Sequence, residues 1–500
     1  MSKVSKKLLS LLIVMAMVAA MVPATGLPVA ATDGSTGNGA AAAAPVEIDN
    51  SNLTLVDGKA DCPVCHTEVT WTPITEAVKI TTSGHYYLPA SLAGDSALAY
   101  QYLEIVDADV CLHLNGNSLI STNVRAIRHR SGTLNIMGNG TVSGTYASVA
   151  GSALEVAGSA EVNLYGGTYV KDWADTEGNA LSTVGVAPVV YMTGGTINMY
   201  KGATIDGSNC SSSTKSAVYL MGTETTPVEF NMFGGTIENG ESEKGGNVYV
   251  GSYSTLNMSG GTIAGGKATD GGNVYVYEAG GFEMSGGTIS GGNVTGTGGN
   301  IYTYKTDVTV SGTAKITGGT AGSLGGNIHF NGINHAYKLT VTGGTIEKGT
   351  ANGTADTYTN ISGATGNIYI PNGQLDIQGG TIAGDIVVRW TSSTVTVSGT
   401  PVITKGNAVG LASNAKLTLG TLSEGASIGI WVKSYGAFTV ANENAANYAQ
   451  YFHSADDTNI YNIKAKDDNI LYAYSVTDNL TDSDEATEGM QALCPVCGTV

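Results

Sequence analysis

The sequence predicts an all-β protein whose main body is a parallel β-helix, a solenoid of short stacked strands. The tetrapeptide Gly-Gly-Thr-Ile begins at Gly234, Gly260 and Gly286, with 26 residues from one copy to the next. A second signature, Gly-Gly-Asn followed by an apolar residue and then Tyr or His, recurs in phase with it at steps of 26 or 27 residues, beginning at Gly245, Gly271, Gly298 and Gly325. The segments between these glycines alternate apolar and polar residues and show no helical period, which is typical of short strands and turns.

A repeat of this length folds by stacking, because one coil cannot bury its own apolar face. Stacking at the strand spacing places Ile237, Ile263 and Ile289 above one another inside the solenoid. The paired glycines then form the tight turns, and the asparagine of each Gly-Gly-Asn is expected to form a hydrogen-bonded ladder at a corner. The leucine spacing and helical back of a leucine-rich repeat are missing, and a propeller blade needs a longer repeat. We expect roughly thirteen coils between residues 95 and 435.

The N-terminal third of the sequence contains three further segments. Residues 1–31 have the form of a secretory signal peptide, with Lys3, Lys6 and Lys7 before an apolar run and cleavage expected near Ala31. Residues 32–60 are rich in Gly, Ala and Asn and are predicted to be a linker. Residues 61–94 carry a Cys-x-x-Cys pair and are predicted to be a small module that caps the solenoid.

The C-terminal segments mirror this organisation. Residues 436–475 are predicted to be a C-terminal cap, because an uncovered strand edge invites pairing with other chains. Residues 476–493 read as an acidic linker. Residues 494–500 repeat the Cys-Pro-Val-Cys of the first module and are interpreted as the start of a second one.

The charge of the chain limits its partners. The formal net charge is −18 and only 13% of the residues are charged, so clustered Lys and Arg for a phosphate backbone or an anionic membrane are lacking. We therefore expect neither nucleic-acid binding nor membrane insertion of the mature chain, which is predicted to be secreted or held at the cell surface.

The Cys-x-x-Cys-His segment suggests a metal site. Cys62 and Cys65, with His66, have the spacing of one half of a tetrahedral zinc site, and His66 or His85 would extend it. A local disulfide and free thiols are the alternatives, and Cys494 with Cys497 would complete a four-thiolate set. Cys111 lies in an apolar alternation and is interpreted as a buried free thiol.

The aromatic residue that follows each Gly-Gly-Asn-apolar unit suggests a binding surface. If the apolar residue points inward, the next side chain must point outward, because side chains alternate along a strand. The result is a stripe with one ring per coil, which suits stacking on sugar rings or on a partner's apolar surface. The alternative is that the rings stack on one another and stabilise the sheet. The members of this stripe are Tyr249, Tyr275, Tyr302 and His329, with Tyr369 after the related Gly366-Asn367-Ile368.

Carboxylates give a weaker signal for catalysis. A one-coil step from Asp270 reaches Lys244 in one direction and Gly296 in the other, so no carboxylate ladder forms there. Asp206, and Asp172 with Asp175, lie on coils of irregular length and are interpreted as solvated turn residues.

The run from Gly271-Gly272-Asn273-Val274-Tyr275 through Ser285-Gly286-Gly287-Thr288-Ile289 resembles the Gly-Gly-x-Ile repeats of adhesin-like proteins and polymorphic outer-membrane proteins. The resemblance covers about residues 105–435. It implies a right-handed β-helix at the cell surface and a role in adhesion. The sequence departs from that family in having no evident wall anchor or C-terminal barrel within this span.

Three functions follow as hypotheses. The first is an adhesin-like protein that binds glycans or host and matrix proteins without catalysis. The second is a polysaccharide lyase or glycoside hydrolase with its site in an inserted loop such as residues 351–363, because such enzymes share the fold. The third is a structural spacer in a larger surface protein.

Overall fold

The computed structural model describes most of the chain between residues 47 and 475. The described ranges are 47–94, 101–122, 125–144, 151–171, 188–208, 215–333, 336–353, 366–389, 393–411, 415–432, 435–455 and 461–475. The predicted signal peptide, the first part of the predicted linker, the acidic linker and the second Cys-x-x-Cys lie outside these ranges, as do Asp172, Asp175 and Cys210. No helix in the described ranges is long and apolar enough to span a membrane.

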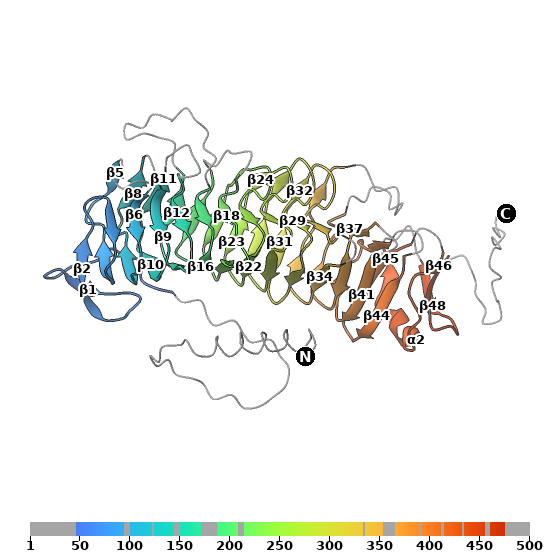
Figure 1. Ribbon diagram of the computed structural model, residues 1–500. Helices are drawn as coiled ribbons and strands as arrows, with labels where there is room; N and C mark the ends of the chain where they lie inside the picture. Colours follow the sequence, from blue (N-terminus) through green and yellow to red (C-terminus); the bar gives the residue numbers. More distant parts are fainter. Residues whose placement is uncertain are drawn as a thin grey trace, which may run out of the picture. The chain divides into compact units, whose positions relative to one another are not determined.

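The described chain is a parallel β-helix, as predicted. Its strands follow one another around three faces, and each strand pairs with the equivalent strand of the next coil, so that the coils stack in sequence order (Figure 1). The pairing is parallel throughout the three faces, except that the first strand, β1, pairs antiparallel with β2. The ladders begin with β1, at the junction of the predicted linker and the N-terminal module, and reach into the predicted C-terminal cap, beyond the limits of 95–435.

The first face contains fifteen strands in the described part of the chain. Their bounds are β1 Lys59–Asp61, β2 Glu68–Pro73, β4 Gly84–Tyr87, β7 Val110–His113, β10 Thr133–Met137, β13 Glu161–Leu164, β16 Gly195–Met199, β19 Val228–Met232, β22 Ser254–Met258, β26 Gly281–Met284, β30 Val308–Val310, β34 Lys338–Val341, β38 Gln374–Ile377, β41 Thr394–Gly399 and β44 Leu417–Leu422.

The second face contains twelve described strands, which carry the Thr-Ile of the repeat. Their bounds are β5 Leu92–Gly94, β8 Ser118–Ser121, β11 Thr141–Gly144, β14 Thr168–Val170, β17 Thr204–Asp206, β20 Thr236–Glu238, β23 Thr262–Ala264, β27 Thr288–Ser290, β31 Lys315–Thr317, β35 Thr345–Ile346, β39 Thr381–Ile382 and β42 Val402–Ile403. Ile237, Ile263 and Ile289 are paired in register and fully buried, as the repeat predicts.

The third face contains fifteen described strands, which carry the aromatic positions. Their bounds are β3 Val78–Ile80, β6 Gln101–Ile105, β9 Arg125–His129, β12 Leu154–Val156, β15 Val190–Met192, β18 Val218–Leu220, β21 Val248–Val250, β25 Val274–Val276, β29 Ile301–Tyr304, β33 Ile328–Asn331, β37 Ile368–Asn372, β40 Ile386–Val388, β43 Val409–Leu411, β45 Ile428–Trp431 and β47 Phe452–Ser454.

Short elements complete the described fold. Four two-residue strands form a small parallel sheet between the second and third faces: β24 Lys267–Ala268, β28 Asn293–Val294, β32 Thr320–Ala321 and β36 Thr350–Ala351. At the C-terminal end lie the helix α2 Ala445–Tyr448, the 3-10 turn η1 Ala449–Tyr451 and an antiparallel sheet of β46 Gly436–Ala437, β48 Tyr461–Ala465 and β49 Leu471–Ser475.

A buried asparagine ladder runs along the corner before the third face, as the Gly-Gly-Asn signature predicts. Asn247 donates to Asn273 at 2.7 Å, and the chain of amide bonds continues through Asn300 and Asn327 to Asn367 at 2.6–2.8 Å. Each oxygen also accepts a backbone N–H, and each amide nitrogen also donates to a backbone carbonyl, for example Gly292 N–H and Thr317 C=O at Asn300. The ladder therefore satisfies the backbone groups of a turn that is closed to water.

The preceding glycines are needed at this corner. Gly271 has a φ of 63°, a backbone conformation that costs little only for glycine. A Cβ on Gly271 would also meet the carbonyl oxygen of Val274 on its own coil and would lie 3.0 Å from the Cβ of Tyr302 on the next coil. The glycine thus lets two coils approach closely enough for the asparagine amides to bond.

Candidate metal centre and aromatic column

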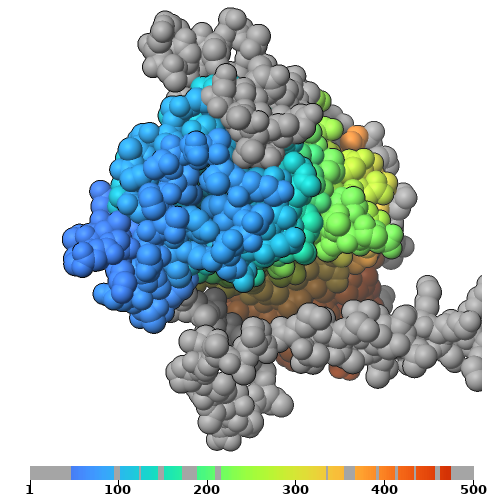
Figure 2. Space-filling view, turned by 60° about the vertical axis from the view of Figure 1, so that its left-hand side comes forward, coloured from blue at the N-terminus to red at the C-terminus, as the bar shows by residue number. Residues whose placement is uncertain are grey.

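A group of three cysteines and one histidine lies at the N-terminal end of the solenoid. One ligand atom from each of Cys62, Cys65, His85 and Cys111 lies within 4.8 Å of the others. The Sγ of Cys65 is 3.3 Å from Nε2 of His85. Cys62 and Cys111 are buried, His85 is half-buried and Cys65 is exposed, so one side of the group faces water. The blue residues that build this end of the stack are visible in Figure 2.

The two N-terminal cysteines lie on a tight turn between β1 and β2. The N–H of Cys65 points to the Sγ of Cys62 at 3.3 Å, and the N–H of Cys62 is bonded to the carbonyl of Thr67 at 2.9 Å. The N–H of His66 closes the turn on the carbonyl of Cys62 at 2.8 Å, with His66 at a φ of 55°. This backbone arrangement turns both sulfurs toward the same point.

The other two ligands come from the first face of the solenoid. His85 on β4 and Cys111 on β7 are direct partners in the parallel pairing, so their side chains point outward from the same position of neighbouring coils. Trp71 precedes them in the same column, and its ring meets the His85 ring edge-on at 5.3 Å. Asn135 follows them and donates to the Sγ of Cys111 at 3.6 Å.

The thiols of the cluster influence one another's ionisation. A hydrogen bond with Cys111 lowers the pKa of Cys62. The same bond raises the pKa of Cys111, and desolvation by burial raises the pKa of Cys65. Because metals bind the thiolate form, a divalent cation at this cluster would hold all three sulfurs as thiolates.

The structure brings together Cys62 and Cys65, as the Cys-x-x-Cys spacing predicts, but His66 lies outside the cluster with its side chain exposed. His85, the alternative to His66, joins them. Cys111 is buried, as expected, but it belongs to the cluster instead of standing alone. No disulfide links these three cysteines. The two ligands outside the Cys-x-x-Cys motif are His85 and Cys111, which are 26 residues apart. This step equals the coil length of the repeat and is the sequence signal that identifies them.

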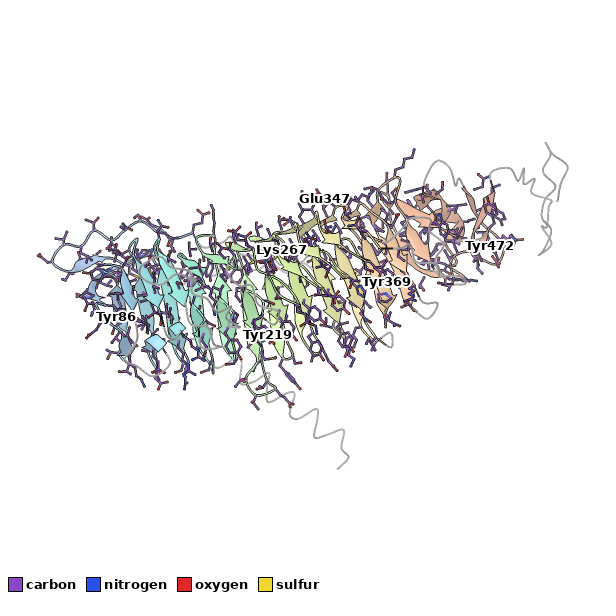
Figure 3. All side chains as sticks on the ribbon, turned by 90° about the horizontal axis from the view of Figure 1, so that it is seen from above. Tyr86, Tyr219, Lys267, Glu347, Tyr369 and Tyr472 are labelled. Carbon is purple, nitrogen blue, oxygen red and sulfur yellow. The ribbon has the colours of Figure 1, made fainter. Side chains whose placement is uncertain are left out.

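The predicted aromatic stripe forms a column on the third face. The apolar neighbours Val248, Val274 and Ile301 are buried inside, and the rings that follow them stack outside. Ring centroids from Tyr249 to Tyr275 are 5.7 Å apart, from Tyr275 to Tyr302 4.8 Å, from Tyr302 to His329 4.7 Å and from His329 to Tyr369 5.3 Å. Two further rings, Tyr191 and Tyr219, extend the column toward the N-terminus. Figure 3 labels two of its members, Tyr219 and Tyr369.

The expectation that these rings are exposed is wrong for most of the column. Tyr275 is 5% exposed, His329 8% and Tyr369 2%. Stacking between coils covers the ring faces, and Leu324 and Trp431 pack beside Tyr369 and Val387. A side chain that points away from the solenoid interior is therefore not necessarily open to solvent. The ligand-binding role of the column remains a prediction, whereas its stacking accounts for a stabilising role.

Alternating charges occupy the N-terminal end of the same column. The register places Lys79, Glu104, Arg128 and Glu155 on successive coils before Tyr191. Glu155 is buried, and its carboxylate forms ion pairs with Arg128, whose Nε lies 2.9 Å from it, and with Arg125. Arg128 is thus part of a buried ion pair, where breaking the pair would leave an uncompensated charge.

His329 gives the column a pH-dependent weakness. Burial lowers the pKa of His329 to about 3, so the unfolded chain takes up a proton below its usual pKa of 6.5 while the folded chain does not. Stability therefore falls as the pH drops below 6.5, by about 2 kcal/mol from this residue at pH 5. Replacing His329 with tyrosine, the residue found at this position in neighbouring coils, is expected to remove that loss. Urea unfolding at pH 7 and pH 5 measures it, and equal pH dependence in both proteins would contradict the assignment.

No protein-family model, curated protein or solved structure significantly matches the chain.

Proposed function

We propose that this chain is a secreted or cell-surface, adhesin-like β-helix that binds polysaccharides or matrix proteins along its faces without catalysis, and that zinc holds its N-terminal end. The observation that supports the binding role is the register of the outward-facing columns, which persists over many coils. A column presents the same position of the repeat at intervals of about 4.8 Å, and a regular face of this kind suits an extended, repetitive partner.

Zinc is proposed for the cluster because of its donor set. Three sulfurs and one imidazole nitrogen form the Cys₃His set of structural zinc sites, and soft thiolates disfavour calcium and magnesium. Four protein ligands leave no open position for a substrate, so the role assigned to the metal is structural. The ion would join the Cys62–Cys65 turn to β4 and β7. It would thereby hold the antiparallel β1–β2 pair over the first coils, and this pair would shield the strand edge at the N-terminal end of the solenoid from other chains.

The binding role is tested by presenting the purified full chain to arrays of glycans and matrix proteins. In parallel, polysaccharides incubated with the chain are assayed for new reducing ends and for unsaturated products. We expect retention on at least one ligand class and no product. Product release would instead establish the polysaccharide lyase or glycoside hydrolase. If the chain shows no retention and forms no product, the structural-spacer hypothesis is the one that stands.

A further inference from the structure

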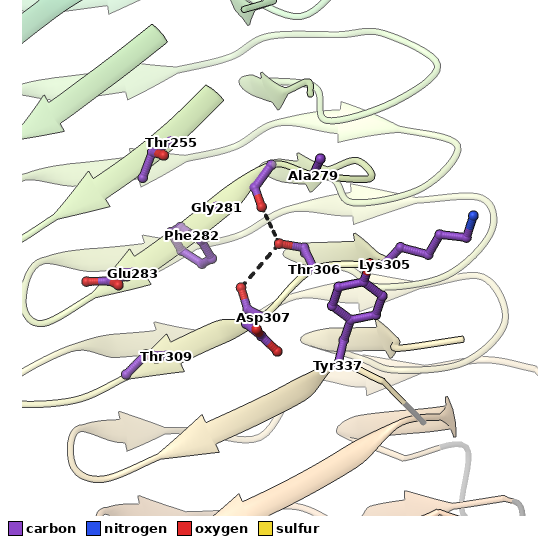
Figure 4. Close-up of a pocket in the computed structure, with 11 residues that line it drawn as sticks. Thr255, Ala279, Gly281, Phe282, Glu283, Lys305, Thr306, Asp307, Thr309 and Tyr337 are labelled. Carbon is purple, nitrogen blue, oxygen red and sulfur yellow. Dashed lines mark hydrogen bonds between the residues drawn. The ribbon is translucent and has the colours of Figure 1, made fainter. Parts of the chain in front are cut away.

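One outward column of the first face is interrupted at a single coil. Glu161, Thr196, Glu229 and Thr255 are paired in register and each projects a side chain from the face, and the next residue in this column is Gly281. Gly281 has no side chain to continue the column, so a notch opens at this coil (Figure 4). It lies between Thr255 on the preceding coil and Asp307, just before β30, on the following coil.

The notch is a measurable cavity with a volume of about 300 Å³, at the lower end of the range for small-ligand sites. Thr255 and Gly281 line it, with the backbone of the Ala279–Gly280 turn at the side. The aromatic ring of Tyr337, which precedes β34, borders the opening together with Lys305. The hydroxyl of Thr306 is bonded to the carbonyl of Gly280, which fixes the turn beside the cavity.

The polar groups around the notch are mostly acceptors. Glu283 and Asp307 are exposed carboxylates on adjacent coils, and neither forms an ion pair with a described residue. One oxygen of Asp307 accepts the backbone N–H of Lys338 at 2.8 Å. Lys305 lines the same cavity and is 3.1 Å from Glu278, so it supplies a donor whose charge is partly neutralised.

We propose that this notch binds one sugar ring of a neutral glycan. The inference rests on the proposed function and assigns a site and a ligand class to it. The face of Tyr337 offers an apolar platform for the C–H face of a sugar ring, while Glu283 and Asp307 accept bonds from its hydroxyls. The carboxylates without ion-pair partners disfavour uronic or sulfated sugars.

Filling the notch tests the proposal without removing any binding group. Gly281 lies in a strand and has an ordinary backbone conformation, and a Cβ there would meet the Thr255 side chain, with Oγ1 at 3.2 Å and Cγ2 at 3.3 Å. Gly281→Thr would restore the column at this coil, and the strand should be as stable as before or more so, because glycine weakens strand interiors. Tyr337→Ala removes the proposed platform, and Tyr435→Ala is its control, because Tyr435 is a 60% exposed ring that does not line the notch.

The measurement is calorimetric titration of the full chain with soluble oligosaccharides of glucose, mannose and galactose, with urea unfolding as the check of folding. We expect binding of at least one of them, a loss of at least tenfold in Gly281→Thr and Tyr337→Ala, and no change in Tyr435→Ala. Unchanged affinity in a folded Gly281→Thr protein would overturn the notch and leave the binding function intact. An acidic oligosaccharide and a basic peptide are titrated alongside, and binding confined to them would also overturn the notch. Binding of no glycan or matrix protein at all would refute the proposed function itself.

Discussion

Replacing Asn300 with alanine is expected to lower the free energy of unfolding by about 4 kcal/mol or more. The side chain makes four hydrogen bonds in a fully buried corner: it donates to Thr317 C=O and to Asn327, and it accepts from Gly292 N–H and from Asn273. Alanine would leave buried donors and acceptors unpaired, and each one costs about 1–3 kcal/mol. Urea unfolding of the full chain measures the change.

A second asparagine ladder provides the matched control. Asn231 on the first face donates to Asn198 at 3.0 Å and accepts from Asn257 at 2.9 Å, with the same side-chain chemistry as Asn300. It is half-buried on the outside of the solenoid, so water can replace its partners. Asn231→Ala is therefore expected to cost under about 1 kcal/mol. Equal effects of the two substitutions would contradict the role given to the buried corner.

Removing the metal is expected to produce the second large effect. Chelation, or Cys111→Ser, should destabilise the N-terminal coils by about 4 kcal/mol where the free zinc concentration is a thousand times Kd. Thermal unfolding with and without chelator measures the loss, and re-addition of zinc should reverse it for the unmodified chain but not for the variant. His85→Ala should behave like Cys111→Ser, while His66→Ala should keep the metal, because His66 lies outside the cluster.

The zinc affinity of the Cys62, Cys65, His85 and Cys111 cluster should fall as the pH falls. The raised pKa values of Cys65 and Cys111 mean that both thiols must release protons when the cation binds. Zinc affinity is therefore expected to fall as the pH falls, and competition with a chromogenic chelator at several pH values follows it. An affinity independent of pH, or one that rises in acid, would show that thiols are not the ligands.

The sequence alone was sufficient to predict the repeat and the buried asparagine ladder at the corner before the third face. The step of 26 or 27 residues places each Gly-Gly-Asn on the same position of successive coils, so the buried ladder from Asn247 to Asn327 follows from the period, and Asn367 continues it after a longer step of 40 residues. Local spacing also identified Cys62 and Cys65. The other two ligands could not be found locally, because His85 and Cys111 meet them only through the stacking of β4 on β7.

The aromatic column shows a second limit of prediction from the sequence. Alternation along a strand correctly predicted that Tyr275 and its equivalents point away from the interior, but it says nothing about what lies against them. Coils of irregular length hid Tyr191 and Tyr219, which lie 28 and 30 residues from the next ring of the column. The notch at Gly281 was also missed, since it depends on a single missing side chain between two coils.

The zinc centre is tested most directly by zinc-edge X-ray absorption on the purified full chain, together with its metal content. We expect one zinc per chain with three sulfur neighbours at about 2.3 Å and one nitrogen neighbour at about 2.0 Å. The zinc content should fall in Cys111→Ser and in His85→Ala, whereas both the zinc content and the spectrum should be unchanged in His66→Ala. A chain that carries no zinc, with Cys62 and Cys65 joined in a disulfide, would contradict the metal-held N-terminal end.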